Sequence, residues 1–326
     1  MSYFKNLLAF LFVWVTIPRI FLRAEIIDEQ HEPLYAGTIL AFYAQNAASG
    51  RLAFQPYFFA TRQYGLYNND WAGPKQKHSS DQLSLLLALE TGITEYIDFT
   101  LDLYGAYSHF NQHHSWIFGD TTTLLGFQIL RDQKKTTTPD FRILIGETFP
   151  TGKYEYLNPH KNGTDSLGNG AYATSLIIVL AKTFYWAHTH PINFNINFYY
   201  IFSSLTKVHG FNRYGGTFDT QGKVKPGDQC ITNFSIQYSL DRRWAIGTDI
   251  RYNHQNHSKF SGKKGNLSDG TTSSIGLPSS EQFSLAPCLE YSWSEDFSVT
   301  LGSWFTVAGR NSPEFMSTAA TLFYYF

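Results

Sequence analysis

The stretch Trp244–Tyr252, "WAIGTDIRY", alternates apolar and polar side chains with a period of two. Trp244, Ile246 and Ile250 fall on one side of an extended chain, and Asp249 falls on the other. Successive side chains of a β-strand point to opposite faces, so this pattern predicts a strand with one apolar and one polar face. Similar alternation recurs at 83–90, 99–104 and 192–200. No amphipathic helical pattern of comparable strength competes with it.

Short connectors alternate along the chain with long polar ones. The long connectors, rich in Gly, Asn, Asp, Ser and Lys, are 65–80, 151–169, 206–227 and 256–280. Outer-membrane barrels have this asymmetry, with tight periplasmic turns and longer extracellular loops. We therefore predict an all-β protein, a transmembrane antiparallel β-barrel of about 12 strands with both ends in the periplasm. The predicted strands are 50–64, 81–92, 97–110, 119–131, 140–150, 170–185, 191–205, 228–240, 243–255, 282–293, 297–309 and 314–326.

Composition excludes several classes of protein. Aromatic residues make up 17% and charged residues 16% of the chain, against about 25% charged residues in a soluble domain. Beyond the N-terminus no apolar run approaches the roughly 20 residues of a membrane-spanning helix. The net charge is -1 with Lys and Arg dispersed, so we expect no nucleic-acid partner.

Because hydrocarbon satisfies no backbone hydrogen bond, spanning strands must close into a barrel whose outer face contacts outer-membrane lipid.

The N-terminus predicts export. Residues 1–24 combine Lys5, the apolar stretch "LLAFLFVWVTI" and Ala24 before a cleavage point, the pattern of a secretory signal peptide. Residues 49–326 then form the barrel. Residues 34–47 could be a further strand, but a thirteenth strand would make the count odd and put the N-terminus outside. We therefore interpret 25–48 as a periplasmic or lumen-inserted segment.

The C-terminal strand carries an aromatic face. Leu322, Tyr324 and Phe326 share one face of the last predicted strand. Aromatic residues collect at membrane interfaces, so Tyr324 and Phe326 are expected in a periplasmic aromatic girdle. The pattern resembles the C-terminal assembly signal of bacterial outer-membrane proteins, and the resemblance implies that the barrel-assembly machinery recognises these three residues.

Two local features qualify the strand pattern. Pro56 and Pro287 lie within predicted strands and remove ladder hydrogen bonds, so we expect β-bulges there. The segment from Ala171 to Lys182 is apolar on both faces. A strand of this kind is expected to pack against something inside the barrel.

Alternation also identifies the residues that point into the lumen. The predicted pore-lining residues are Glu90, Asp102, Arg142, Asn193, Asn195, Asn197, Asn233, Gln237, Asp249, Arg251 and Glu290. Selective ion pores use rings of one sign of charge, whereas this set mixes both signs. We expect passage of neutral or weakly charged solutes. The alternative is that these side chains pair with one another and fill the barrel.

Three short motifs carry a family resemblance. "GRLAFQPYFF" at 50–59, "FPTGKY" at 149–154 and "LAKTF" at 180–184 resemble the transporter family of the MetA-pathway of phenol degradation, over about residues 50–326. The resemblance implies an outer-membrane barrel that moves small, often aromatic or hydrophobic, solutes. It carries over no catalytic residue.

Transport is therefore the leading function, for small neutral, hydrophobic or aromatic solutes. The alternatives are a plugged structural or adhesive barrel and an outer-membrane lipid hydrolase. Hydrolysis needs a nucleophile within reach of an oriented base, and no pattern identifies one, so we expect no enzyme. Cys230 and Cys288 match no metal or disulfide spacing, and no cofactor or metal is expected.

Overall fold

The computed structural model describes residues 34–74, 79–133, 136–185 and 190–326. The predicted signal peptide, residues 1–24, lies outside the described residues, as do residues 25–33 of the predicted N-terminal segment. The described chain is built of β-strands, with one short 3-10 helix, η3 (Pro159–Lys161). Within these ranges no helix has the length and apolar character needed to cross a membrane.

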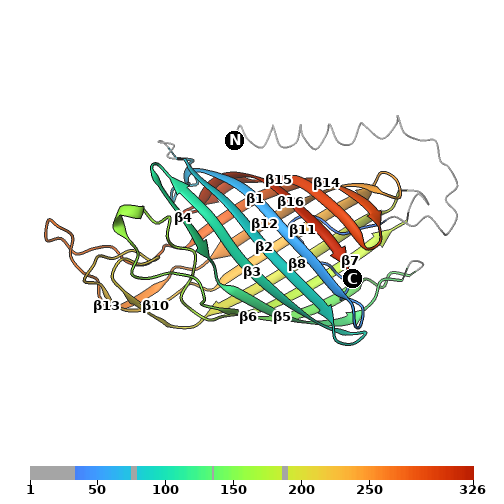
Figure 1. Ribbon diagram of the computed structural model, residues 1–326, viewed down its shortest axis with the longest axis horizontal. Coiled ribbons are helices and arrows are strands. Elements are labelled where there is room, and N and C mark those ends of the chain that lie inside the picture. Colours follow the sequence, from blue (N-terminus) through green and yellow to red (C-terminus); the bar gives the residue numbers. More distant parts are fainter. Residues whose placement is uncertain (1–33, 75–78, 134–135, 186–189) are drawn as a thin grey trace.

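Twelve antiparallel strands close into a barrel (Figure 1), as predicted. Each strand pairs with its neighbour, β1 pairs with β16, and β2 pairs with β3, so the barrel sheet has no free edge along its spanning part. The barrel strands are β1 (Leu52–Leu66), β2 (Ser80–Gly92), β3 (Ile97–Phe110), β5 (Thr121–Leu130), β6 (Asp140–Phe149), β7 (Ala173–Phe184), β8 (Ile192–Ser203), β11 (Gln229–Ser239), β12 (Trp244–Gln255), β14 (Ser280–Ser294), β15 (Phe297–Arg310) and β16 (Pro313–Tyr325).

One strand is longer than the alternation indicates. β4 (His113–Phe118) pairs with the second half of β3, from Gly105 to Phe110. β5 pairs with its first half, from Ile97 to Asp102. Only Gly119 and Asp120 separate β4 from β5, so the two are successive pieces of one strand. The predicted strand 119–131 covers β5 and misses β4, because in "HHSWIF" each face of the strand begins with a histidine and no strict apolar alternation results.

The two faces of the barrel differ as the alternation predicts. Large apolar side chains on the outer face are 40% or more exposed, since lipid is their expected environment. They include Leu83, Leu85, Leu103, Leu125, Ile145, Leu176, Ile196, Phe198, Ile250, Leu289 and Leu301. Inward positions of the same strands are mostly polar and buried. A closed sheet with an apolar outer belt is the architecture of an outer-membrane barrel.

An aromatic girdle lies at the periplasmic end of the outer face. Trp244 contacts Tyr291, with ring centroids 4.6 Å apart, and Tyr291 contacts Trp293 at 4.7 Å. Tyr324 and Phe326, 4.5 Å apart, continue the girdle on the last strand. Both are exposed, as the sequence predicts for interface residues. Recognition of Leu322, Tyr324 and Phe326 by the assembly machinery stays a prediction.

The predicted bulges at Pro56 and Pro287 are absent. The registers of β1 with β16 and of β14 with β15 continue unchanged across these prolines. Proline removes a donor from the ladder but adds no residue, so the strand keeps its register. The irregularities fall elsewhere, at Gln63/Gly65 in β1, at Phe283/Ser284 and Ser292/Ser294 in β14, and at Gln128/Leu130 in β5.

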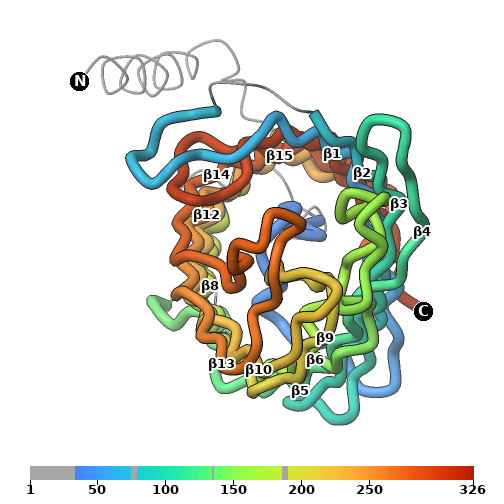
Figure 2. The backbone as a smooth tube through the Cα atoms, turned by 90° about the vertical axis from the view of Figure 1, so that its left-hand side faces the viewer, coloured from blue at the N-terminus to red at the C-terminus, as the bar shows by residue number. Residues whose placement is uncertain are grey.

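Part of the long extracellular connectors is ordered into a second sheet. β9 (Thr206–His209), β10 (Gln221–Lys225) and β13 (Lys259–Lys263) form three antiparallel strands in the order β13-β10-β9. The predicted loops 206–227 and 256–280 therefore contain strands that alternation in such short segments did not reveal. Buried Val208, Tyr214 and Val224 pack there with residues of the other loops. We call this assembly the extracellular cap; Figure 2 shows its yellow and orange loops crossing the mouth of the barrel.

The lipid-facing assignment is tested by Leu301, which is 55% exposed on β15. We expect Leu301→Arg to lower the free energy of unfolding by about 2–4 kcal/mol in lipid vesicles, because a charge near the bilayer midplane loses its hydration. Leu267→Arg, in an extracellular loop where Leu267 is 49% exposed, is the control and should change it by less than about 0.5 kcal/mol. Equal effects in urea titrations of the two variants would contradict the assigned outer face.

Candidate functional site: the barrel lumen

A segment without regular secondary structure lies inside the barrel. We call residues 34–48 the lumen segment; its blue trace runs within the ring of strands (Figure 2). At its start, Leu34 N–H donates to the Arg242 carbonyl at 3.1 Å. Just beyond its end, Gly50 N–H donates to the Gly92 carbonyl at 2.9 Å. Arg242 and Gly92 lie at short periplasmic turns, so the segment enters and leaves by the periplasmic end.

Side chains of the barrel wall satisfy the backbone of the lumen segment. The Asp249 carboxylate accepts from the Thr38 hydroxyl at 2.8 Å and from Leu40 N–H at 3.1 Å. Asn197 Oδ1 accepts from Phe42 N–H at 2.7 Å, and Asn195 Nδ2 donates to the Phe42 carbonyl at 2.8 Å. The two asparagines therefore hold Phe42 at both of its backbone groups. Buried backbone groups need such partners, and here the wall supplies what a neighbouring strand would supply elsewhere.

The neighbouring strand β14 repeats this arrangement nearer the start of the segment. Glu290 Oε1 accepts from Ala36 N–H at 2.6 Å. Gln237 also donates to the Glu290 carboxylate, and Ser292 Oγ donates to it at 3.0 Å. Asn233 Nδ2 donates to Asp249 at 2.9 Å. The acids that hold the segment are thus themselves held by other side chains of the wall.

Apolar contacts accompany these hydrogen bonds. Ala44 belongs to a buried cluster with Ile177, Val179 and Tyr199, and Phe42 packs against that cluster. The rings of Phe42 and Tyr199 are 5.7 Å apart. The prediction that the doubly apolar segment 171–182 packs against something inside the barrel is confirmed by these contacts.

Two wall glycines make room for the lumen segment. A Cβ on Gly302 would lie 2.5 Å from Ile39 Cδ1, and a Cβ on Gly92 would lie 2.2 Å from the Ala48 carbonyl oxygen. Real Cβ atoms do not approach so closely. At Gly92 the near atom belongs to the segment backbone, so only glycine permits that proximity, whereas at Gly302 the Ile39 side chain would have to shift.

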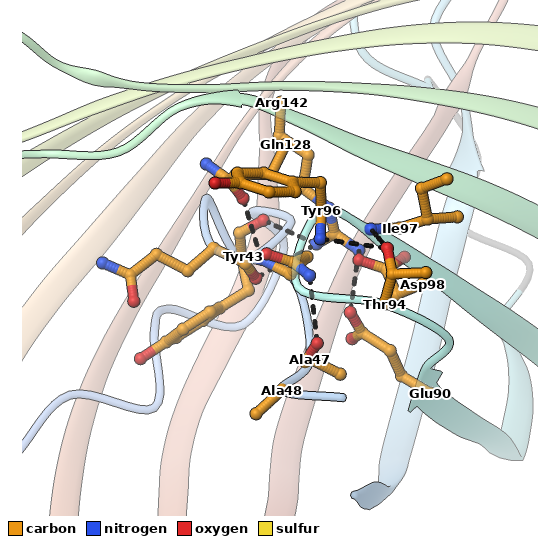
Figure 3. A network of polar contacts seen from close by, with 12 residues as sticks. Tyr43, Ala47, Ala48, Glu90, Thr94, Tyr96, Ile97, Asp98, Gln128 and Arg142 are labelled. Atoms are coloured by element: carbon orange, nitrogen blue, oxygen red, sulfur yellow. Dashed lines mark hydrogen bonds and ion pairs between the residues drawn. The ribbon is translucent and has the colours of Figure 1, made fainter. Parts of the chain in front are cut away.

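Arg142 joins the segment to a second group of wall residues (Figure 3). Its Nη2 lies 2.7 Å from Glu90 Oε1 and 2.6 Å from Asp98 Oδ2. Its Nη1 donates to the carbonyl oxygens of Tyr43, at 3.0 Å, and Gln45, at 3.3 Å. The Arg142 side chain is 1% exposed and that of Asp98 0%. One buried guanidinium therefore pairs with two carboxylates, its single positive charge offsetting one of their two negative charges, and donates to two segment carbonyls, which is the kind of pairing that burial of a charge requires.

The predicted pore-lining residues fall into three groups, and all point inward. Five bond directly to the lumen segment: Arg142, Asn195, Asn197, Asp249 and Glu290. Three act through those five: Glu90, Asn233 and Gln237. Among the described residues, the other three form no hydrogen bond to the segment: Asp102, Asn193 and Arg251. Asn193 donates to Thr183 instead, and the Arg251 guanidinium lies 5.6 Å from the Tyr199 ring. Their role in lining a pore stays a prediction.

Several participants are missing from the sequence-based set. Asp98 lies two residues before Thr100 and four before Asp102, on the same inward face of β3. The alternation of this strand could therefore have identified it. Gln128, whose Oε1 accepts from Asn46 N–H at 2.9 Å, follows from β5 in the same way. Gly126 has no such signal. A Cβ there would lie 2.3 Å from Asp98 Oδ1, so its lack of a side chain makes room for the Arg142 pair.

An aromatic wall lines the lumen beside the segment. Tyr57, Phe59, Trp304 and Phe315 project inward from β1, β15 and β16, and each is partly exposed. Phe59 and Trp304 are 6.1 Å apart, and Trp304 and Phe315 are 4.9 Å apart, both edge to face. Trp304 Nε1 donates to Ser284 Oγ at 2.9 Å, which fixes the indole. Phe59 packs against the cluster that contains Ile39 of the lumen segment.

The described residues hold no group of three His, Cys, Asp or Glu side chains that could bind a metal ion.

Comparison with known proteins identifies a family and a fold. The family model described as "Putative MetA-pathway of phenol degradation" matches residues 73–322. A search of curated proteins found no match. Among solved structures, the COG4313 outer membrane channel from Pseudomonas putida F1 is similar with a TM-score of 0.62 and 12% identity, covering 93% of this chain and 100% of that chain. At that identity the similarity establishes the outer-membrane barrel fold.

Two further channels are more distant. The monoaromatic hydrocarbon channel CymD has a TM-score of 0.39 and 10% identity, with 87% of this chain and 90% of that chain covered. The Pseudomonas putida toluene transporter TodX has a TM-score of 0.36 and 9% identity, with 84% and 88% covered.

The Arg142 node can be tested against an exposed ion pair of the same chemistry. We expect Arg142→Leu to lower the free energy of unfolding by about 3–5 kcal/mol, because the buried Asp98 and the partly buried Glu90 lose their cation. Arg62, 2.7 Å from Asp81 on the outer face with both side chains exposed, provides the control. Arg62→Leu should cost less than about 1 kcal/mol. Urea unfolding followed by tryptophan fluorescence measures both, and similar losses would refute the assigned importance of the buried node.

Proposed function

The chain belongs to the family of the MetA-pathway of phenol degradation, and from that premise we propose that it is an outer-membrane channel for small aromatic and other hydrophobic solutes. The family's name associates it with phenol, a small neutral aromatic molecule. The barrel supplies a route across the membrane, and the solute class is argued from the lumen.

The aromatic wall carries this proposal. Tyr57, Phe59, Trp304 and Phe315 present ring faces and edges to the lumen on three adjoining strands. Aromatic pairs gain about 0.5–1.5 kcal/mol beyond area burial, which is enough to favour aromatic solutes without trapping them. Conduction requires this kind of weak, repeated binding.

The charges of the lumen are compatible with neutral cargo. Asp249 and Glu290 accept hydrogen bonds from the lumen segment, and Glu90 and Asp98 pair with Arg142. These carboxylates are therefore already engaged. A passing solute would meet aromatic rings and amides rather than a ring of free charge of one sign.

The lumen segment is the proposed gate of the channel. It occupies the periplasmic part of the lumen, next to the aromatic wall, because Phe59 of that wall packs against the cluster of Ile39, Cys288 and Ala319. We propose that a solute collected at the aromatic wall passes when the segment shifts from the wall. Transport rather than catalysis is proposed, because the lumen offers binding surfaces and no assigned nucleophile.

A plugged structural barrel remains the second candidate, and the density of bonds between wall and segment favours it. Asp249, Asn197, Asn195, Glu290 and Arg142 all hold the segment in place. The two candidates differ in whether the segment moves, and the experiments below separate them.

The aromatic wall is tested by Trp304→Ala. Loss of one aromatic contact worth about 0.5–1.5 kcal/mol should slow uptake of labelled phenol or toluene into proteoliposomes by about two- to tenfold. Trp244→Ala, which removes an outward-facing indole from the periplasmic girdle, is the matched control and should leave uptake unchanged. If wild-type protein admits no labelled aromatic solute, the channel proposal fails.

Movement of the segment is tested by a reversible crosslink. Ile39 packs directly against the native Cys288, so Ile39→Cys in a Cys230→Ser background should form a disulfide that fixes the segment. We expect conductance steps in planar bilayers to disappear on oxidation and return on reduction. Ile39→Ser in the same background cannot crosslink and should not respond to oxidant. Identical conductance in the crosslinked and reduced protein would place the solute path away from the segment.

A further inference from the structure

The extracellular cap carries a dense basic surface. The three strands β9, β10 and β13 bury one face and expose the other. The exposed face carries five lysines, which we call the lysine face: Lys207, Lys223, Lys225, Lys259 and Lys263. The buried face carries Val208, Val224 and Phe260. Five cations on one side of three short strands are notable in a chain whose net charge is -1.

Like charges stand directly opposite one another on this face. Lys223 of β10 is the register partner of Lys207 of β9. Lys225 of β10 is the register partner of Lys259 of β13. Directly opposed like charges destabilise a β-sheet. The sheet therefore holds an arrangement that is unfavourable by itself and that an anion between the strands would relieve.

Neighbouring acids neutralise only part of the face. Lys263 Nζ lies 3.0 Å from Asp219, and hydrogen bonds from Thr217 and then Lys263 lower the pKa of Asp219 to about 2. Lys225 Nζ lies 3.9 Å from Asp228. Within residues 190–326, which are described without a gap, Lys207, Lys223 and Lys259 form no ion pair with an acid.

Protection of sheet edges does not account for the pattern. Lysines on edge strands prevent edge-to-edge aggregation, which would explain Lys207 on β9 and Lys259 on β13. β10 is the central strand and pairs on both sides. Lys223 and Lys225 therefore protect no edge, and their charge calls for another explanation.

The lysine face stands at the extracellular rim, just above the lipid belt. β9 follows β8, whose outward Tyr200 and Phe202 are exposed to lipid. Lys207 lies five residues beyond Phe202, at most about 17 Å along an extended strand. The buried face packs against Tyr154 and Ile275 of neighbouring loops, so the lysine face lies on the side of the sheet away from those loops. It lies where lipid headgroups of the outer leaflet would meet the protein.

We propose that the lysine face binds the phosphate groups of a phosphorylated glycolipid of the outer leaflet, of the lipopolysaccharide type. The lysines would place ammonium groups on both sides of each phosphate, so that the opposed pairs Lys207/Lys223 and Lys225/Lys259 become bridged pairs. Bound glycolipid would anchor the extracellular cap to the membrane surface. The solute path is not involved, so this inference is independent of the transport proposal.

Binding is tested with purified full-length protein in detergent and lipopolysaccharide, by native mass spectrometry. Removing two of five lysines in Lys207→Gln/Lys223→Gln should weaken binding by on the order of tenfold. Arg242→Gln/Arg243→Gln, which removes the same charge at a periplasmic turn, should bind like wild type. Enzymatically dephosphorylated lipopolysaccharide should bind wild type as weakly as phosphorylated lipopolysaccharide binds the lysine variant.

A charge swap separates this role from a structural one. Lys223→Glu turns the repulsive pair with Lys207 into an attractive one, so it should raise the melting temperature of the glycolipid-free protein while lowering glycolipid affinity. Unchanged affinity in either lysine variant, or equal binding of the dephosphorylated form, would overturn the proposal. So would displacement of the glycolipid by micromolar inorganic phosphate, which would instead indicate a site for small anions.

Discussion

The requirement that every backbone group in hydrocarbon be paired governs this structure. Lipid offers no hydrogen bonds, so each unpaired N–H or C=O costs several kcal/mol, and strands span a bilayer only as a closed sheet. The pairing of β1 with β16 completes that closure. Closure also determines which side chains suit the outer face. Because the sheet pairs all backbone groups, the outward side chains need only be apolar, as Leu301 and Ile145 are.

Buried backbone groups inside the barrel also need hydrogen-bond partners, but there side chains supply them rather than a neighbouring strand. The lumen segment has no strand beside it, yet its backbone groups are buried. Asn197, Asp249 and Arg142 donate to or accept from those groups. The inward polar residues are thus explained by the segment they hold. Beside the segment, the aromatic wall around Trp304 and Phe315 presents surfaces suited to apolar solutes.

Alternation predicted the twelve barrel strands and the inward direction of residues such as Asn197 because side-chain direction is a local property of the strand. It could not predict which group each inward residue meets, since Asn197 and Phe42 are 155 positions apart in the chain. It also missed Gly126, whose contribution is an empty volume. The bulges expected at Pro56 and Pro287 were wrong because loss of one donor does not require an extra residue.

The two kinds of pairing differ in what their loss would cost, and this difference decides which part of the molecule can move. A barrel strand that left the sheet would expose its backbone to hydrocarbon at several kcal/mol per group. A lumen-segment bond, such as that between Phe42 N–H and Asn197, can be exchanged for a bond to water in the lumen, at a net cost of only about 0.5–1.5 kcal/mol. The barrel strands therefore stay in place because lipid cannot replace their hydrogen bonds. The hydrogen bonds of the lumen segment, in contrast, can be replaced by bonds to water one at a time. A gate built from the lumen segment needs no opening of the sheet, and the side chains that release it are left facing water rather than lipid.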